Sequence, residues 1–361
     1  MSSKNWDRLH STLVPILSLF SGAGGMDLGF YRAGFMALLA IDISPAAVKT
    51  YKRNHPHARV ECLDLSQVQA EELVELWNSC SGGQAPVGIV GGPPCQAFSV
   101  SNVRQSPDDP RAQLVVRYAE IIRVFAERAG IAFFVFENVP GLLGKRHRDR
   151  YELFKKLCRH AGFRIYEKLI DAVNFGVPQY RPRIFVVGFN ENLLPDIEFE
   201  IPEGDSEPVP VSAVLQGLPE PAYYRPGLKP GDIPFHPNHV TQRPKSEKFR
   251  NGSLVPGKVV GRSFRVLRWD APSWTVAYGH REVHIHPGGH RRLSVLEAML
   301  LQGFPPSYVL EGTLSQQITL VSDAVPPPVG EAVARAIAQA LEKARGGLVE
   351  KWQALAAPGG I

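Results

Sequence analysis

The stretch VPILSLFSGAGG, residues 14–25, decides the fold of this chain. Its apolar beginning predicts a short strand, and residues 25–33 predict a helix. The glycine turn between them, residues 20–25, lets the backbone bend tightly and approach a ligand, while the N-terminus of the following helix favours polar or anionic groups. Taken alone, the same pattern is also compatible with a plain strand-to-helix turn that binds nothing.

Strand-like and helix-like segments alternate through the first half of the chain. Ser44 and Pro45 open one helix as its N-cap and first helical residue. The alternation is typical of an α/β fold, in which helices cover both faces of a mainly parallel sheet. The predicted strands are residues 35–43, 87–90, 131–136, 164–172 and 183–189, and the longer predicted helices are residues 111–129 and 151–161.

The alternation stops near Asn190. Residues 191–265 are rich in Pro and Gly, which predicts a smaller, irregular or β-rich domain, with a disordered insert as the alternative. Helical patterns return at residues 293–302 and 329–343. We therefore divide the chain into a first domain (residues 1–190), a middle segment (residues 191–292) and a return segment (residues 293–361) that completes the first domain.

Cysteine usage and hydropathy favour an intracellular protein. Four scattered cysteines without a C-x-x-C pair indicate neither a disulfide framework nor a zinc site, and so predict a reducing compartment. No apolar run approaches the ~18 residues of a membrane span. The N-terminal residues lack the basic and apolar pattern of a signal peptide.

Basic residues are concentrated in one part of the chain. The net charge is only +5, but eleven Lys or Arg residues lie within residues 241–292, opposed by three acidic residues. The preceding residues 191–232 are acidic. This distribution predicts a polyanion-binding face, and a solvated surface is the alternative.

Two acidic residues follow predicted strands. Asp42 ends the second strand, ~20 residues after the glycine turn, where nucleotide-binding α/β folds place an acid for ribose hydroxyls. Asp64 ends another apolar stretch, where it could accept an adenine amino group. Each acid alone is compatible with an ordinary loop residue, but together with the glycine turn they indicate an adenosyl cofactor.

Further reactive side chains follow other strands. Cys95 lies in GGPPCQAFS, residues 91–99, at the carboxyl end of a strand, where parallel sheets bind ligands. Glu137 follows the next strand, so a nucleophilic thiol and a proton-transferring carboxyl group are expected at one sheet edge. Arg181 and Arg183 could bind a phosphate or a base carbonyl, or form a simple surface pair.

These residues, in this order, resemble the DNA cytosine-5 methyltransferase family. The matching segments extend from Phe20 to Gly330 and are FSGAGG, GPPCQAFS, FENVP, QYRPR, RLSVLEAMLLQGFP and DAVPPPVG. The resemblance implies a Rossmann-like domain that uses S-adenosylmethionine and has a mainly parallel sheet. It also implies a smaller, irregular or β-rich target-recognition domain within residues 191–292.

The resemblance assigns a role to each matching residue. Cys95 is the expected nucleophile, and Glu137 is expected to bind the ring nitrogen beside the cytosine amino group. Arg181 and Arg183 would orient the base and the nucleophile loop. The expected cofactor contacts are Phe20, Gly22, Gly24, Asp42 for the ribose, Asp64 for the adenine, and Asp323.

Two positions depart from the family pattern. The first turn often begins with an acidic residue, where this chain has Ser18. The late motif commonly has Asn before its A-V-P, where this chain has Asp323. Asp323 would weaken cofactor binding unless its carboxylate meets the cofactor's ammonium group or a backbone N–H group.

The substrate implied by the resemblance is double-stranded DNA, with the target cytosine flipped out of the helix at a cost of a few kcal/mol. The middle segment would read the site through base edges and phosphates. Candidate contacts are Arg243, Lys245, Arg250, Asn251 and Arg262, each of which could instead lie on a solvated surface.

A cluster of histidines resembles a metal site only superficially. His280 and His284 have helical i, i+4 spacing, and His286 and His290 follow. Residues 287–289, Pro-Gly-Gly, argue against a helix, and no acidic or Cys ligand is obvious. We expect a DNA-facing or structural loop and no metal.

Three other functions remain as alternatives: an RNA methyltransferase with the same catalytic set, a non-catalytic DNA-binding module, and a nucleotide-binding oxidoreductase. The basic segment favours DNA over RNA, and PPCQ has no role in an oxidoreductase. We expect a monomeric, cytoplasmic enzyme of a bacterial or phage restriction-modification system. A cognate restriction endonuclease would be a functional partner and not a physical one.

Overall fold

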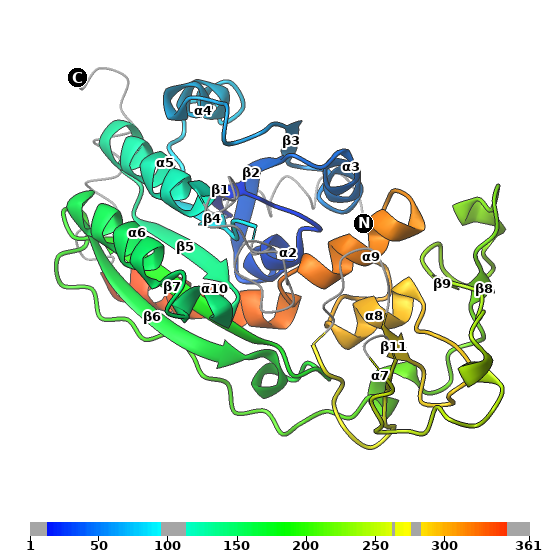
Figure 1. The fold of residues 1–361 in the computed structure, drawn as a ribbon. Helices are drawn as coiled ribbons and strands as arrows, with labels where there is room; N and C mark the ends of the chain where they lie inside the picture. Colours follow the sequence, from blue (N-terminus) through cyan, green and yellow to red (C-terminus); the bar gives the residue numbers. More distant parts are fainter. Residues whose placement is uncertain (1–12, 95–112, 262–263, 276–282, 345–361) are drawn as a thin grey trace.

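A seven-stranded sheet lies at the centre of the molecule (Figure 1). The computed structural model describes residues 13–94, 113–261, 264–275 and 283–344. In spatial order the strands are β3 (Arg59–Cys62), β2 (Phe35–Asp42), β1 (Val14–Leu19), β4 (Gly88–Gly91), β5 (Phe133–Asn138), β7 (Pro182–Asn190) and β6 (Phe163–Asp171).

The sheet is mainly parallel, as predicted. Strands β1 to β5 pair in parallel, whereas β7 is antiparallel to both β5 and β6. The physical reason lies in the connection between β6 and β7, which contains only a short 3₁₀ turn, η3 (Ala172–Phe175). Parallel strands need a crossover of about a dozen residues or more, usually with a helix.

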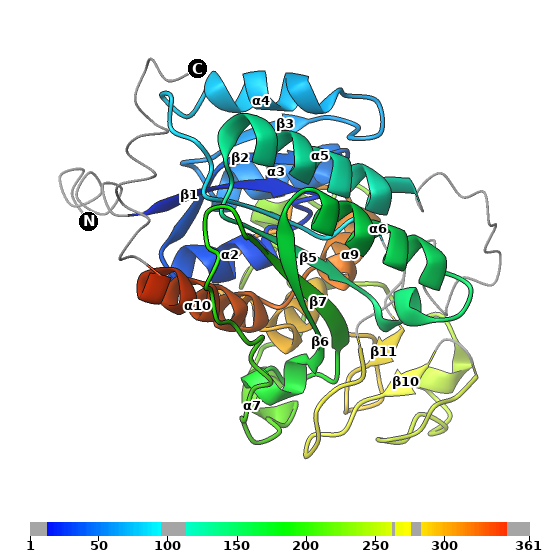
Figure 2. The ribbon, with the colours of Figure 1, turned by 90° about the vertical axis from the view of Figure 1, so that its left-hand side faces the viewer.

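Helices cover both faces of the sheet (Figure 2). One face packs against α4 (Ala70–Asn78), α5 (Leu114–Ala129) and α6 (Arg148–His160). The other face packs against α2 (Gly25–Arg32), α3 (Pro45–Asn54) and α10 (Pro327–Lys343). The predicted N-cap of α3 is confirmed, because the Ser44 hydroxyl accepts the N–H of Ala47 at 3.4 Å.

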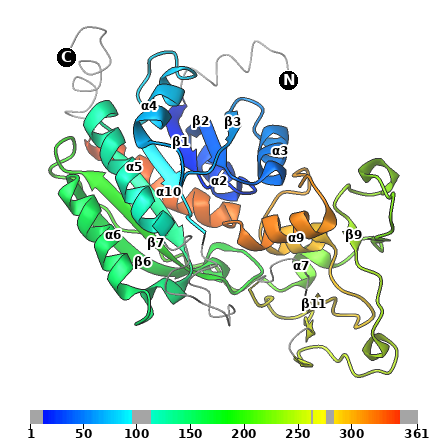
Figure 3. The same cartoon turned by 45° about the horizontal axis from the view of Figure 1, so that its top comes forward.

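Among its described residues the middle segment contains little regular structure, and it lies beside α8 and α9 at one end of the sheet (Figure 1 and Figure 3). Its strands pair in two short ribbons, β8 with β9 and β10 with β11. The helices and strands not yet given are η2 (Pro140–Leu143), α7 (Ser212–Leu215), β8 (Ala222–Tyr223), η4 (Pro230–Asp232), β9 (Val240–Thr241), η5 (Glu247–Phe249), β10 (Arg265–Val266), β11 (His284–Ile285), α8 (Val295–Leu301) and α9 (Leu314–Asp323).

The middle segment has small apolar clusters of its own. One contains Leu254, Val266 and Ile285, and another joins Val211 and Leu215 to residues of the return segment. Its status as a separate domain, and the boundaries at residues 190 and 292, stay predictions. None of the helices in the described part of the chain is both long and apolar enough to span a bilayer.

Candidate active site

A cavity of about 400 Å³ opens at the carboxyl ends of the parallel strands and is called the strand-end cavity below. Because β7 is antiparallel to β5, it begins where β5 ends, and this brings Arg183 to the same sheet edge as Glu137. The end of α9 closes another side. The predicted site residues on its wall are Phe20, Gly22, Asp42, Asp64, Glu137, Arg183 and Asp323.

The glycine turn is held by Asp42. One oxygen of its carboxylate accepts the N–H of Gly22 at 2.9 Å, and the other accepts the N–H of Ser44 at 2.8 Å. Burial raises the pKa of Asp42, and these two hydrogen bonds oppose that effect. Within the turn Phe20 has φ 53°, a left-handed conformation that non-glycine residues rarely adopt. Such backbone strain clusters at ligand-binding sites.

Gly24, predicted as a cofactor contact, is absent from the described residues that line the cavity. It is the N-cap of α2, with φ 76°. A Cβ atom at this position would lie 2.7 Å from both the Nε2 of His55 and the hydroxyl of Tyr308. The structure therefore gives Gly24 a packing role beneath the turn.

Asp64 lies half-buried on the cavity wall, in the loop after β3. Its Oδ1 atom accepts the backbone N–H of Ser66 at 2.9 Å and the Ser66 hydroxyl at 2.7 Å. These bonds fix the carboxyl group and occupy one of its oxygens. Its predicted contact with adenine stays a prediction.

Cys95 lies outside the described residues, and the loop that leads to it borders the cavity. Pro93 and Pro94 line the cavity. The side-chain amide of Asn138 donates to the Pro93 carbonyl at 3.0 Å, which fastens this loop to the end of β5. A Cβ atom at Gly92 would lie 3.0 Å from a carboxylate oxygen of Glu137, so glycine allows the loop to approach that side chain closely.

Glu137 is buried, with 7% of its surface exposed, and pairs with Arg183. The Nε atom of Arg183 lies 3.1 Å from its Oε1 atom. Burial raises the pKa of Glu137, while Arg183 and Arg181 lower it and Asp323 raises it further. The net effect is a raised pKa, so Glu137 holds a proton more readily than an ordinary glutamate and is better suited to donate one.

Arg181 contacts the end of α9, and its predicted role in orienting the base and the nucleophile loop stays a prediction. Its side chain is 1% exposed and donates to the carbonyls of Ser322 at 2.7 Å and Ala324 at 2.9 Å. These carbonyls flank Asp323 at the end of α9. Arg181 therefore fixes the backbone around Asp323, and only Arg183 of the pair lines the cavity.

Asp323 faces the strand-end cavity from the end of α9, and its side chain is exposed there. The protein around it nevertheless raises the pKa of its carboxyl group, an effect that Arg181 and Arg183 oppose. Sequence reasoning missed α9, and with it the further lining residues Ser315, Gln316, Thr319 and Leu320. The T-x-x-Q capping box at Thr313 and Gln316 was the available signal.

The candidate DNA contacts of the middle segment are exposed. Arg243, Lys245, Arg250 and Asn251 all lie at the surface, and Arg262 lies outside the described residues. Arg243 lies over the ring of Tyr223, 5.6 Å from its centroid. This arrangement leaves the guanidinium accessible to a polyanion.

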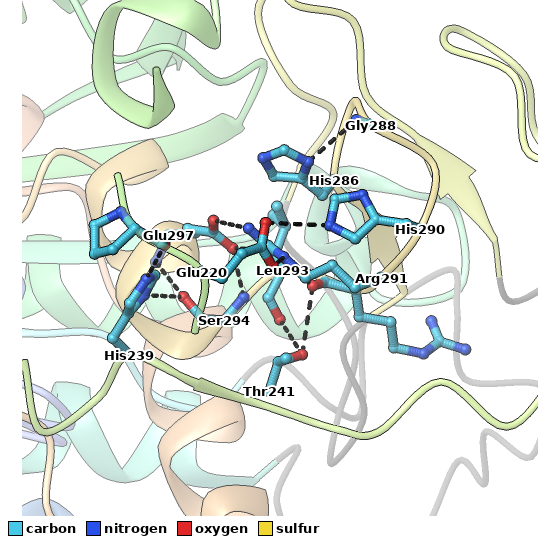
Figure 4. Close-up of polar contacts among 12 residues, drawn as sticks. Glu220, His239, Thr241, His286, Gly288, His290, Arg291, Leu293, Ser294 and Glu297 are labelled. Carbon is cyan, nitrogen blue, oxygen red and sulfur yellow. Dashed lines mark hydrogen bonds and ion pairs between the residues drawn. The ribbon is translucent and has the colours of Figure 1, made fainter. Parts of the chain in front are cut away.

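One basic residue of the segment is not available to DNA. Arg291 is 2% exposed and forms a bidentate ion pair with Glu297 of α8, at 2.8 and 2.9 Å (Figure 4). Its Nε atom also lies 2.8 Å from Glu220. Next to this pair, His239 bonds the Ser294 hydroxyl at 2.9 Å. These buried polar contacts join the middle segment to α8.

The histidines that suggested a metal have other partners. His290 lies 3.2 Å from Glu220, and His286 accepts the N–H of Gly288 at 3.1 Å. His284 is fully buried and stacks on Trp274. Within the described residues no group of three or more His, Cys, Asp or Glu side chains could hold a metal ion. His280 lies outside them.

Comparisons with known proteins agree on one family. Residues 14–339 match the family model for C-5 cytosine-specific DNA methylase. The Type II methyltransferase M.MthTI of Methanothermobacter thermautotrophicus is 30% identical over 354 residues, covering 91% of this chain and 98% of the relative. M1.HphI of Haemophilus parahaemolyticus is 33% identical over 344 residues, covering 90% and 86%.

Solved structures share the fold. An Escherichia coli prophage protein, described as a DNA modification methyltransferase in tentative terms, superposes with a TM-score of 0.76 at 24% identity, covering 91% of this chain and 99% of that one. A DNMT2 variant of Spodoptera frugiperda superposes with a TM-score of 0.61 at 18% identity, covering 91% and 99%. With the family model matching most of its length, the chain belongs to the C-5 cytosine-specific DNA methylase family and is a DNA cytosine-5 methyltransferase.

Proposed function

We propose that this enzyme methylates a flipped-out cytosine of double-stranded DNA through a covalent bond to Cys95, with S-adenosylmethionine as the methyl donor. One observation carries the proposal. Glu137, buried and paired with Arg183, lies on the wall of the same cavity that Pro93 and Pro94 border just before Cys95. A thiol nucleophile assisted by a carboxyl group that transfers a proton would suit covalent catalysis.

The strand-end cavity fits an adenosyl cofactor. Its volume of about 400 Å³ lies in the range of small-molecule sites. Asp42 and Asp64 would hold the adenosine, and the glycine turn would hold the amino-acid portion at the N-terminus of α2. When bound, the cofactor supplies an electrophilic methyl group on a sulfonium sulfur.

The protein side chains act on the cytosine. The Cys95 thiolate adds to carbon 6, and Glu137 gives a proton to the ring nitrogen beside the amino group, so that carbon 5 becomes an enamine carbon and a nucleophile. The raised pKa of Glu137 keeps more of it protonated near neutral pH than an ordinary glutamate. After carbon 5 is methylated, it loses its proton, Cys95 leaves carbon 6 as a thiolate, and the ring nitrogen returns its proton to Glu137.

The names of the relatives support a biological role for the enzyme, because several of them are called Type II methyltransferases. We place this enzyme in a restriction-modification system, where it methylates one short sequence as a monomer in the bacterial cytoplasm. Methylation would protect that sequence from a cognate endonuclease that need not bind this chain.

The test compares Cys95→Ala with the wild type. Purified protein is incubated with tritiated S-adenosylmethionine and either unmethylated genomic DNA or tRNA, and 5-methylcytosine is located by bisulfite sequencing. We expect label in DNA within one short motif, no label from Cys95→Ala, and similar DNA binding by both proteins. Label in tRNA alone would refute the substrate, and a fully active Cys95→Ala would refute the covalent step.

A further inference from the structure

A buried carboxyl group beneath the glycine turn has no ion pair with a described residue. Asp27, in the first turn of α2, is 4% exposed and borders the strand-end cavity. Its Oδ1 atom is inaccessible to solvent and accepts no hydrogen bond from the described residues. A buried anion without a counter-charge is costly, so a cationic partner would stabilise it strongly.

The groups around Asp27 are neutral. The hydroxyls of Ser18 on β1 and Tyr51 on α3 face its carboxyl group, yet neither completes a hydrogen bond of normal length and angle. Burial raises the pKa of the Tyr308 and Tyr118 hydroxyls, and both lie close enough to Asp27 for its charge to raise them further. His55, which bonds Tyr308, has a pKa lowered to about 4 by burial and is therefore neutral at pH 7.

Ser18 is also the position where the family pattern often has an acid. In this chain Asp27 reaches the same place from α2, so the structure keeps a carboxyl group beneath the turn although Ser18 is not acidic.

The other acids of the cavity already have partners. Both oxygens of Asp42 accept backbone N–H groups, and Asp64 accepts two bonds from Ser66. The positive charges of Arg181 and Arg183 lie near Asp323 and lower the pKa of its carboxyl group, against the effect of burial. Asp27 therefore differs from these acids, because it is buried on this wall without a positively charged partner among the described residues.

We infer that Asp27 binds the ammonium group of the cofactor's amino-acid portion, taking the place of an acid at Ser18. The inference rests on the proposed function, because it assumes an adenosyl amino acid in the strand-end cavity. The N–H groups at the start of α2 would take the carboxylate of that portion, and Asp27 would take its ammonium group a few atoms away.

The test measures binding by calorimetry for two compounds that share the adenosine and the sulfur. S-adenosylhomocysteine carries the amino-acid chain, whereas 5′-methylthioadenosine lacks it. We expect Asp27→Asn and Asp27→Ser to weaken S-adenosylhomocysteine roughly ten- to a hundredfold, the effect of losing a charged hydrogen bond. Binding of 5′-methylthioadenosine should stay within about twofold of the wild type.

Relocating the acid gives a sharper result. The double variant Ser18→Asp with Asp27→Ser should recover most of the lost affinity for S-adenosylhomocysteine, and thermal denaturation checks that each variant folds. In the wild type this affinity should rise between pH 5 and 7 as Asp27, whose pKa is about 6, becomes charged. The Asn variant should lack this rise.

Two results would overturn the inference. The first is a loss of affinity that is equal for the two compounds, which indicates a purely structural role for Asp27. The second is unchanged S-adenosylhomocysteine binding in a folded Asn variant. A wild-type protein that binds neither compound would instead refute the proposed function, and the inference with it.

Discussion

The two sides of this molecule are held together by different forces. On the cofactor side, β1, β4 and β5 are buried between two layers of helices, and apolar side chains supply the contacts. In its described residues the middle segment has only two-residue strands and small apolar clusters. Beside an apolar cluster that includes Leu301, buried polar groups join it to α8, among them the ion pair of Arg291 with Glu297 and the bond of His239 to Ser294 (Figure 4).

The difference means that residues used for catalysis and residues used for folding lie in different parts of the molecule. Nondirectional apolar packing fixes the sheet, and side chains at the strand ends are then free to serve the reaction. In the middle segment a buried charge depends on one particular partner, so the loss of that partner disturbs the fold. Changes at the sheet edge should therefore impair catalysis and spare stability, and changes in the buried polar contacts should do the reverse.

The largest effect is expected at the sheet edge. Glu137→Gln keeps the shape of the side chain but cannot transfer a proton, so the rate of methyl transfer in a single turnover should fall by roughly 10²–10⁴-fold. Binding of S-adenosylhomocysteine should change little, and thermal denaturation checks that the variant folds although Arg183 loses its ion pair with Glu137. A rate within tenfold of the wild type would show that Glu137 is not the proton donor.

The next effect is expected at the buried ion pair. Among the described residues, Glu297→Gln leaves the 2% exposed Arg291 with only Glu220 as a counter-charge, and it should cost about 3 kcal/mol of unfolding free energy in denaturant titrations. The matched control is Glu127→Gln, which breaks a pair with Arg123 at the same 2.8 Å on the exposed surface of α5. That change should cost under about 0.5 kcal/mol. Equal costs for the two variants would contradict the comparison.

Acidification should change the folding stability in opposite directions through two buried groups, one on each side of the molecule. Burial lowers the pKa of His286 from 6.5 to about 4, so its neutral form stabilises the protein above pH 6.5, and this stability is lost as the pH falls. Burial raises the pKa of Asp27 from 3.8 to about 6, so its contribution is present at low pH and is lost as the pH rises through 6.

Two variants isolate these contributions. Between pH 7 and 5, the wild type should lose about 2 kcal/mol relative to His286→Asn, and gain about 1 kcal/mol relative to Asp27→Asn. Asn at position 286 keeps an acceptor for the N–H of Gly288. Denaturant titrations at both pH values give the differences. A shift of the same sign for both variants would contradict this assignment of charges.

The contrast between local apolar packing and specific polar contacts also explains which features the sequence predicts. The strand predicted at residues 183–189 is β7, Pro182–Asn190, because a continuous apolar run identifies a buried strand. The strand β3 was missed, since it has four residues at the edge of the sheet with one of them buried. The partners Glu220 and Arg291 are 71 residues apart, and each alone resembles a surface residue, so no local pattern reveals their contact.

Site residues divide in the same way. Motif positions such as Glu137 and Asp42 were found because a strand end places them, and strand ends follow from apolar patterns. The burial of Arg181 and the position of Asp27 beside Ser18 depend on how separate elements pack, which spacing along the chain does not specify. The position of α9 on the cavity wall likewise depends on the packing of separate elements.

The smallest effect is expected where the middle segment meets DNA. Arg243 is exposed over Tyr223, and its removal should cost one phosphate contact, with little effect on folding. For Arg243→Ala the slope of log affinity against log salt should become shallower by about 0.9, and binding should weaken by under about 1 kcal/mol at moderate salt.

A salt titration by fluorescence anisotropy on a labelled duplex of random sequence measures both quantities. The control is Arg128→Ala, which removes the same charge from the exposed end of α5 on the cofactor side and should leave the slope unchanged. If Arg243 instead read a base edge, its loss would cost about 1–3 kcal/mol on the methylated motif and broaden the set of sequences that are modified. An unchanged salt slope would exclude Arg243 from the DNA interface, and would narrow the search to Lys245, Arg250 and Asn251.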